Sequence, residues 1–173
     1  MRIYLAGFDV FRPDATAHGD HLKQLCASFG HEGLFPLDNA APSHLSGAAL
    51  AQWICRANLQ LIDNCDLVMA NANHFRGHEP DSGTVFEMGY AHAKGKPVWA
   101  YTDQDRDLLA QTGARWHAQE SRHVDSQGYT VEDFGLPLNL MLACTAHIVT
   151  GDAAACLKAI AGSAPADCPW PSP

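Results

Sequence analysis

Short apolar runs alternate along this chain with segments whose apolar residues recur at helical spacing. The run Ile3 to Gly7 precedes a predicted helix from about Gly19 to Phe29. The run Asp66 to Ala70 follows a predicted amphipathic helix from Ala48 to Asn64. Strands separated by helices in this way form right-handed crossovers, which produce a parallel sheet covered by helices on both faces. The sequence therefore predicts an α/β fold.

In such folds, ligands bind beyond the carboxyl ends of the strands, so we expect the site in the loops after Leu5, Ala70 and Tyr101. Further predicted elements are an extended segment Leu34–Leu37, a helix Gly83–Lys94, a strand Val98–Tyr101, a helix Leu136–Cys144, a strand His147–Val149 and a helix Asp152–Ala161. The chain length of 173 residues predicts a single domain, over residues 1–162.

Two segments lack this pattern. The stretch from Thr112 to Phe134 is polar and has no periodicity, which predicts a flexible excursion or lid, or else disorder. Residues 163–173 form a proline-rich tail, for which we expect no regular structure.

The charge of the chain limits its partners. It has 19 acidic and 11 basic residues, a formal net charge of -8, and no run of Lys or Arg. Binding to the phosphates of a nucleic acid requires a basic patch that displaces counterions. The charge balance therefore argues against a nucleic-acid partner but permits a small neutral molecule such as a nucleoside.

The sequence also carries no signal that would direct the chain into or across a membrane. Met1 leads directly into an apolar run, without the basic region and cleavage site of a signal peptide, and no apolar stretch reaches about 18 residues. The six cysteines include no C-x-x-C pair, as expected of reduced thiols. We therefore expect a cytoplasmic protein with no membrane contact.

Neither a metal nor another cofactor is expected. Four residues of metal-binding type lie close together in the sequence: His74, His78, Glu79 and Asp81. Gly77 and Pro80 interrupt any helix there, so the H-x-x-x-H arrangement of a helical zinc site cannot form. The chain contains no G-x-G-x-x-G motif, Walker A loop or G-x-S-x-G elbow.

The most informative stretch is residues 78–91, H-E-P-D-S-G-T-V-F-E-M-G-Y-A. It places the carboxylate of Glu87 among apolar residues in the first turn of a predicted helix. One interpretation is structural, because Thr84-x-x-Glu87 matches a capping box. The other is a nucleophile that the positive end of the helix keeps ionised and that faces the crevice at the strand ends.

Other candidates also have two interpretations. Asp81 either stabilises the start of the same helix or belongs to the site, and Asp66 is either a solvated strand-end acid or a site residue. Tyr4 is either a core aromatic residue or a phenol that hydrogen-bonds to a carboxylate. Gly7 is either a turn glycine or a point where a ligand approaches the backbone.

Four blocks of sequence considered together are more specific. They are I-Y-L-A-G at residues 3–7, N-C-D-L-V-M-A at 64–70, F-R-G-H-E-P-D-S-G-T-V-F-E-M-G-Y-A at 75–91 and F-G-L-P-L-N-L-M-L at 134–142. They resemble the nucleoside 2-deoxyribosyltransferase family, most closely in D-S-G-T-x-x-E-x-G-x-A. The resemblance implies a flavodoxin-like fold with a mostly parallel five-stranded sheet, a homo-oligomer, and transfer of a 2-deoxyribosyl group between nucleobases.

The resemblance also implies roles for individual residues. Glu87 matches the nucleophile and Tyr4 the tyrosine that orients it. Asp66 and Asp81 match two acids that bind and protonate the base or hold the sugar hydroxyls, with Asp66 the first choice as general acid. Asn139 and Met141 match a segment that a neighbouring subunit donates to bind the sugar. Phe8 is expected to stack on the base, and Gly7, in the loop after the first strand, stays a candidate substrate-binding residue.

The implied substrates are deoxynucleosides and free nucleobases. The implied reaction consists of two displacements at the same sugar carbon, with net retention of its configuration. One alternative is a hydrolase that cleaves deoxynucleoside 5′-monophosphates, for which Arg12 and Arg76 could bind phosphate. A second alternative is a nucleotide-sensing module without catalytic activity. Purine or pyrimidine specificity is left open, because the segment 112–134 matches no motif of the family.

Overall fold

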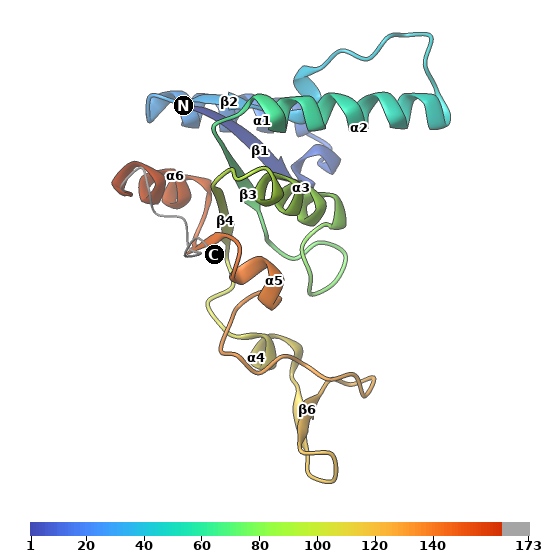
Figure 1. The fold of residues 1–173 in the computed structure, drawn as a ribbon, viewed down its shortest axis with the longest axis vertical. Coiled ribbons are helices and arrows are strands. Elements are labelled where there is room, and N and C mark those ends of the chain that lie inside the picture. The colour runs from blue at the N-terminus through green and yellow to red at the C-terminus, as the bar shows by residue number, and fades with distance from the viewer. Residues whose placement is uncertain (164–173) are drawn as a thin grey trace.

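The fold is built on a sheet of five strands, all parallel, in the order β2-β1-β3-β4-β7 (Figure 1). This computed structural model describes residues 1–163, so the tail predicted from residue 163 onward lies almost entirely outside the described residues. The strand order and the helices on both faces match the predicted flavodoxin-like α/β class.

The strands and helices follow the alternation expected from the sequence. The sheet strands are β1 (Arg2–Gly7), β2 (Glu32–Leu34), β3 (Leu67–Asn71), β4 (Val98–Thr102) and β7 (His147–Thr150). The helices are η1 (Phe8–Phe11), α1 (Ala15–Ser28), η2 (Pro36–Asp38), α2 (Gly47–Asn64), α3 (Ser82–Ala93), α4 (Leu108–Thr112), α5 (Leu140–Ala143) and α6 (Ala153–Gly162). A separate hairpin consists of β5 (Arg115–His117) and β6 (Arg122–Val124).

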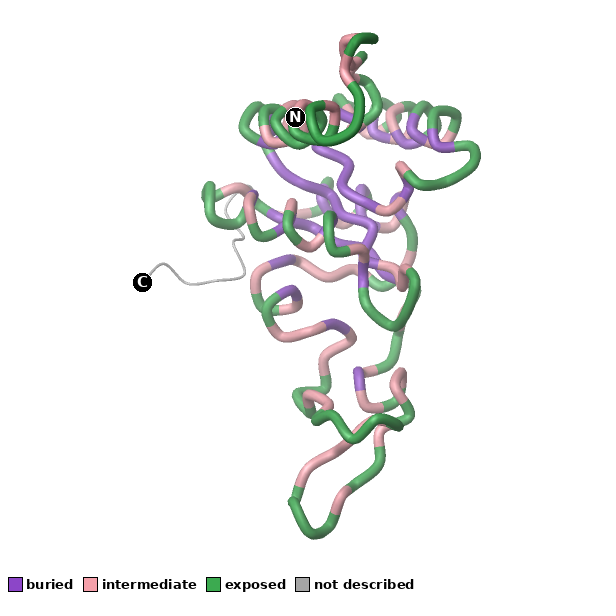
Figure 2. The backbone as a smooth tube through the Cα atoms, turned by 90° about the vertical axis from the view of Figure 1, so that its right-hand side faces the viewer, coloured by how far each residue is buried: buried purple, intermediate pink, exposed green. Residues whose placement is uncertain are grey.

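Successive residues of β1 point to opposite faces of the sheet and so join two different cores. Ile3 and Leu5 pack with residues of α1 and α6, including Leu22 and Leu157. Tyr4 and Ala6 pack on the other face, with residues of α2, α3 and α5. Figure 2 shows that the buried residues concentrate in the sheet and on the inner sides of these helices. Each face of the sheet therefore has its own core and its own region beyond the carboxyl ends of the strands.

Several predicted boundaries were wrong, each for a local reason. α1 begins at Ala15 rather than near Gly19, which lies inside the helix and lets it approach Phe35 closely. A Cβ atom at Gly19 would lie 2.4 Å from the Phe35 ring. The predicted helix from Leu136 is limited to Leu140–Ala143, since Asn139 caps its start.

The predicted excursion from Thr112 to Phe134 contains the β5–β6 hairpin rather than a structureless loop. The hairpin extends away from the sheet at the end opposite α1 and α2 (Figure 1). Its residues are exposed or half-buried, as Trp116 illustrates with an exposed side chain. The segment therefore has defined structure but adds nothing to the core of the sheet.

Candidate active site

The side chains of Tyr4 and Glu87 meet between β1 and α3. The Tyr4 hydroxyl donates a hydrogen bond of 2.6 Å to Glu87 Oε1. Tyr4 is fully buried because its strand position points toward the core under α2 and α3. The phenol of Tyr4 thus hydrogen-bonds to a carboxylate, which is the second of the two interpretations given for this residue.

Glu87 does not form the capping box that its spacing from Thr84 suggested. Asp81 is the N-cap residue of α3, and its Oδ2 accepts a 3.0 Å hydrogen bond from the Thr84 amide. Glu87 consequently lies in the second turn of the helix rather than the first. Its carboxylate is free of any helix-capping contact and lines a crevice instead.

The surroundings of Glu87 favour its protonated form, contrary to the expectation that the helix end keeps it ionised. Burial raises the pKa of Glu87 to about 7, and the negative charge of Asp81 adds to this effect. The hydrogen bond from Tyr4 and the nearby Asn58 side chain lower the pKa and partly oppose the rise. Burial and the adjacent Glu87 carboxylate raise the pKa of Tyr4, so the phenol remains a donor. Glu87 is therefore poised to titrate near neutral pH.

The crevice above this pair has a volume of about 320 Å³ and lies at the carboxyl end of β1. Its polar lining includes Asp81, Asn58 and Glu87, and its apolar walls come from η1, η2 and α2. A cavity of this size can hold a small organic molecule. Gly7 forms part of the lining. Only glycine fits at this position, because a Cβ atom there would lie 2.6 Å from Asp9 Oδ2 and 2.9 Å from Asn71 Cβ.

Asn58 is a crevice residue that the sequence analysis missed. It lies on α2, lines the crevice and adjoins the Glu87 carboxylate. Its Oδ1 is buried and has no hydrogen-bond partner among residues 1–163. The sequence offered one signal, a polar residue next to the apolar stripe of a predicted amphipathic helix.

The aromatic residue in this crevice is Phe11 rather than Phe8. Phe11 lines the crevice together with Val10, whereas Phe8 lines a different cavity. Both rings stack on Phe75, at centroid distances of 5.0 Å for Phe8 and 5.5 Å for Phe11. Phe11 therefore occupies the place at the crevice that was expected of Phe8, and stacking of either ring on a base stays a prediction.

Asp66 does not lie in the crevice. It precedes β3 at the amino end of the sheet, and its Oδ2 accepts a 2.6 Å hydrogen bond from the Arg2 amide. The crevice lies at the other end of the same strands, near Gly7. Asp66 is exposed, which is the arrangement of a solvated strand-end acid, and its position away from the crevice does not fit its predicted role as general acid.

Asn139 and Met141 also lie outside the crevice of their own chain. The Asn139 amide donates a 2.7 Å hydrogen bond to Glu132, and its Oδ1 accepts one from the Met141 amide. The Met141 side chain is 64% exposed. Any contribution of these residues to a site therefore requires a neighbouring subunit, as the resemblance implied.

Residues 1–163 contain no candidate membrane-spanning helix and no candidate metal-binding cluster. No helix in this part of the chain is both long and apolar enough to cross a membrane. No cluster of three or more His, Cys, Asp or Glu side chains in the same range could hold a metal ion.

Comparison with known proteins gives the crevice a family context. Residues 3–141 match the sequence profile of the nucleoside 2-deoxyribosyltransferase family. A solved structure described as a 2-desoxiribosyltransferase from Leishmania mexicana shares 34% identity and a TM-score of 0.72, covering 89% of this chain and 93% of that one. A 2-deoxyribosyltransferase from Bacillus psychrosaccharolyticus shares the fold, at 22% identity and a TM-score of 0.52, covering 77% of this chain and 87% of that one.

An uncharacterised protein of Schizosaccharomyces pombe is 36% identical over 107 residues, or 60% of this chain. The match spans only 51% of that protein's length. The profile match includes Asp81 and Glu87, which line the crevice, and Tyr4, which hydrogen-bonds to Glu87. The chain belongs to the nucleoside 2-deoxyribosyltransferase family.

Proposed function

We propose that this protein transfers a 2-deoxyribosyl group from one nucleobase to another through a covalent intermediate on Glu87. The observation that carries the proposal is the 2.6 Å hydrogen bond from Tyr4, which fixes the Glu87 carboxylate at the wall of a crevice of nucleoside size. The family match and the Leishmania mexicana structure support this class of enzyme.

In the first step, a Glu87 oxygen attacks C1′ of the sugar on the face opposite the base. The C1′–N bond breaks, its electron pair passes to the base, and the base takes up a proton from water in the open crevice. In the second step, a nitrogen of the incoming base attacks C1′ and displaces the carboxylate, and this nitrogen then loses its proton. Two inversions give net retention, as in retaining glycosidases.

The remaining polar groups of the crevice bind the substrate. Asp81 Oδ2 is held by the Thr84 amide and hydroxyl, at 3.0 and 3.3 Å, which leaves Oδ1 to accept a hydrogen bond from a sugar hydroxyl. Asn58 has an unpartnered Oδ1 that can accept a hydrogen bond from the base. If water attacks C1′ in the second step in place of the incoming base, the enzyme releases free sugar slowly.

The deoxynucleoside monophosphate hydrolase is a less favoured alternative. No Lys or Arg is among the described residues that line the crevice. Arg12 pairs with Asp14 at 2.9 Å and lines another cavity, and Arg76 lies over the rings of Phe75 and Phe11. A phosphate group would therefore meet the carboxylates of Asp81 and Glu87 without a compensating cation.

We further propose that the protein is a homo-oligomer in which Asn139 and Met141 complete the site of a neighbouring subunit. The exposed Met141 side chain and its distance from the chain's own crevice support this arrangement. Met141→Asp should weaken both the oligomer, measured by sedimentation, and base exchange. An assembled enzyme with full exchange activity would contradict the shared site.

The activity test is incubation with deoxyinosine and free adenine, followed by chromatography of the deoxyadenosine formed. Glu87→Gln should abolish exchange, and intact-mass measurement with deoxyinosine alone should detect a deoxyribosyl adduct only in the unmodified enzyme. The matched control is Glu32→Gln, a change at an exposed glutamate on β2 outside the crevice. Release of base from a deoxynucleoside monophosphate, without exchange, would favour the hydrolase.

A further inference from the structure

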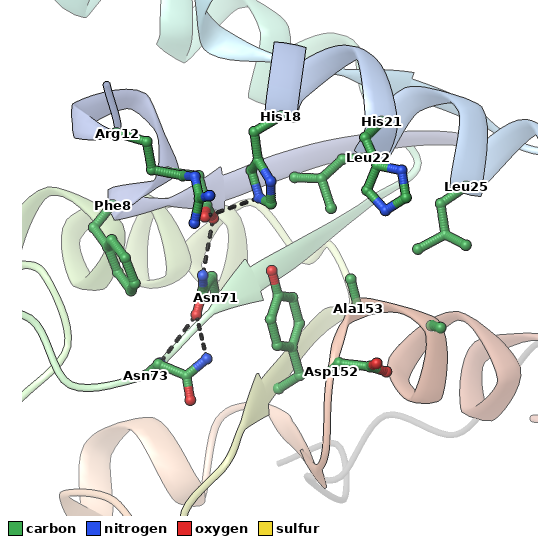
Figure 3. Close-up of a pocket in the computed structure, with 13 residues that line it drawn as sticks. Phe8, Arg12, His18, His21, Leu22, Leu25, Asn71, Asn73, Asp152 and Ala153 are labelled. Atoms are coloured by element: carbon green, nitrogen blue, oxygen red, sulfur yellow. Dashed lines mark hydrogen bonds and ion pairs between the residues drawn. The ribbon is translucent and has the colours of Figure 1, made fainter. Parts of the chain in front are cut away.

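A second cavity of about 510 Å³ lies on the opposite face of the sheet from Glu87. Figure 3 shows His18, His21, Leu22 and Leu25 along one side, with Asp152 and Ala153 facing them across the space. The helical side belongs to α1, and Asp152 and Ala153 stand at the start of α6. The family match assigns no role to this space between the two helices.

Side-chain hydrogen bonds and an ion pair connect the polar residues at the floor of this cavity (Figure 3). Buried Asp9 accepts a 2.9 Å hydrogen bond from Asn71 and lies 3.1 Å from His18 Nε2. Asn73 donates a 2.8 Å hydrogen bond to Asn71 Oδ1. These contacts occupy Nε2 of His18 and leave Nδ1 without a partner among residues 1–163. The imidazole is thus oriented but retains one nitrogen for a ligand.

Tyr101 supplies the observation that points most directly to a ligand. Its side chain is 6% exposed and lines the cavity, yet its hydroxyl has no hydrogen-bond partner within the described part of the chain. Burial, with the charges of Asp9 and Asp152, raises the pKa of Tyr101, so the phenol remains a donor. Because Tyr101 lines the cavity, an acceptor on a ligand there can replace water as the hydrogen-bond partner of this hydroxyl.

The charges around the cavity favour a neutral ligand. Asp152 Oδ1 accepts a 2.8 Å hydrogen bond from the Ala155 amide, so the N-terminus of α6 already has a carboxylate. Asp9 adds a second acid, and Arg12, which also lines the cavity, is paired with Asp14. An anion would meet two carboxylates here, whereas a neutral molecule with mixed donors and acceptors would not be repelled.

We propose that this second cavity binds a neutral nucleobase or its deoxynucleoside. Apolar side chains of Phe8, Leu22 and Leu25 provide walls for a flat ring, and Tyr101, His18 and Asp152 provide one donor and two acceptors for its polar edge. The choice of nucleobases among neutral heteroaromatic molecules rests on the proposed function.

The two cavities share one structural element. Phe8 and Asp9 of η1 line the second cavity, and Val10 and Phe11 line the Glu87 crevice. A ligand in either cavity therefore contacts the same short helix. Binding must for this reason be observed residue by residue, since a bulk affinity would not separate the two sites.

The test is a titration with adenine, deoxyadenosine or inorganic phosphate, in which binding is monitored through the chemical shifts of backbone amides. Amides of Ala153 and Ala154 report on the second cavity, and those of Gly83 and Thr84 report on the crevice. Adenine or deoxyadenosine should shift both groups saturably, and the ligand with the lower saturating concentration identifies the base or the nucleoside as the preferred form. Tyr101→Phe should weaken binding at Ala153 and Ala154 about five- to tenfold, because one hydrogen bond is lost.

Tyr129→Phe is the matched control, since Tyr129 is an exposed tyrosine that lines neither cavity, and it should change neither binding curve. The proposal is overturned if neither adenine nor deoxyadenosine shifts the Ala153 and Ala154 amides up to its solubility limit, if Tyr101→Phe leaves binding there unchanged, or if only phosphate binds. An enzyme active in base exchange but without these shifts refutes this inference alone. Shifts without exchange activity refute the proposed function alone.

Discussion

Tyr4 and Glu87 are 83 positions apart in the sequence, yet the phenol of one donates a 2.6 Å hydrogen bond to the carboxylate of the other. The pair joins the middle of β1 to the second turn of α3. Because both side chains are largely removed from water, the bond acts on an acid whose pKa burial has already raised. This relationship determines both the stability and the reactivity expected of the site.

The raised pKa of Glu87 predicts that the folded state loses stability as the pH rises from about 4.5 to about 7. In this window the folded protein binds more protons than the unfolded chain, so increasing pH favours unfolding. Glu87→Gln removes the titration and retains an oxygen for Tyr4. The variant should exceed the unmodified protein in unfolding free energy by about 3 kcal/mol near pH 8, with little difference below about pH 4.5.

Thermal unfolding of both proteins across this pH range measures the difference. Glu32→Gln should leave the curve nearly unchanged, because Glu32 is exposed. A constant difference between Glu87→Gln and the unmodified protein at all pH values would contradict the raised pKa.

Tyr4→Phe should shift the pH dependence of base exchange toward alkaline values. The Tyr4 hydrogen bond lowers the pKa of Glu87, so its loss leaves burial less opposed and raises that pKa above about 7. The rising limb of kcat/KM against pH, which reports the ionised nucleophile in the free enzyme, should move in the same direction. A purely structural role for Tyr4 would lower activity without moving the limb.

Asp81→Asn should separate the capping role of Asp81 from its proposed contact with the sugar. Asn caps helices about as well as Asp, so the unfolding free energy should change by less than about 1 kcal/mol. Exchange with deoxyinosine should fall, because the amide is a weaker acceptor for the sugar hydroxyl. With 2′,3′-dideoxyinosine, which lacks the 3′-hydroxyl, the loss should shrink; an equal loss with both substrates would contradict the contact.

Gly7→Ala should destabilise the protein and reduce activity together. The added Cβ would lie 2.6 Å from Asp9 Oδ2 and 2.9 Å from Asn71 Cβ, which are both buried. Relieving this overlap requires movement of the hydrogen-bonded pair or the strand end, at a cost of about 1–3 kcal/mol. Urea unfolding measures the loss of stability. Gly113→Ala is unsuitable as a control, because Gly113 has a positive φ that alanine would strain. Gly89→Ala, where the added atom meets nothing within 4 Å, is the matched comparison.

Phe11→Ala should raise the KM for the nucleobase about two- to tenfold through loss of an aromatic contact. The ring lines the Glu87 crevice and is 57% exposed, so its removal should cost little stability. Phe8→Ala removes the other ring that stacks on Phe75 but leaves the crevice lining intact. A larger effect of Phe8→Ala on KM would restore Phe8 as the stacking residue.

The alternation of apolar runs and helical stripes was sufficient to predict the parallel sheet and its two covered faces. These patterns are local, because the spacing of apolar residues within one short segment indicates burial on one face of a helix or on both faces of a strand. The family block from Asp81 to Ala91 likewise singled out Glu87 and Asp81 from one continuous segment. Elements interrupted by glycine or proline were placed less well, as Gly19 in α1 shows.

Long-range placement was decided only by the tertiary structure. Asp66 and Asp81 are equivalent candidates as residue types, but strand direction puts Asp66 at the amino end of the sheet and Asp81 at the crevice. Asn58 reaches Glu87 because α2 and α3 pack on the same face of the sheet. The sequence by itself thus determined the fold class and singled out Glu87, which the structure places at the crevice. Which side chains surround that acid depends on contacts between distant segments, and their burial in turn sets its pKa.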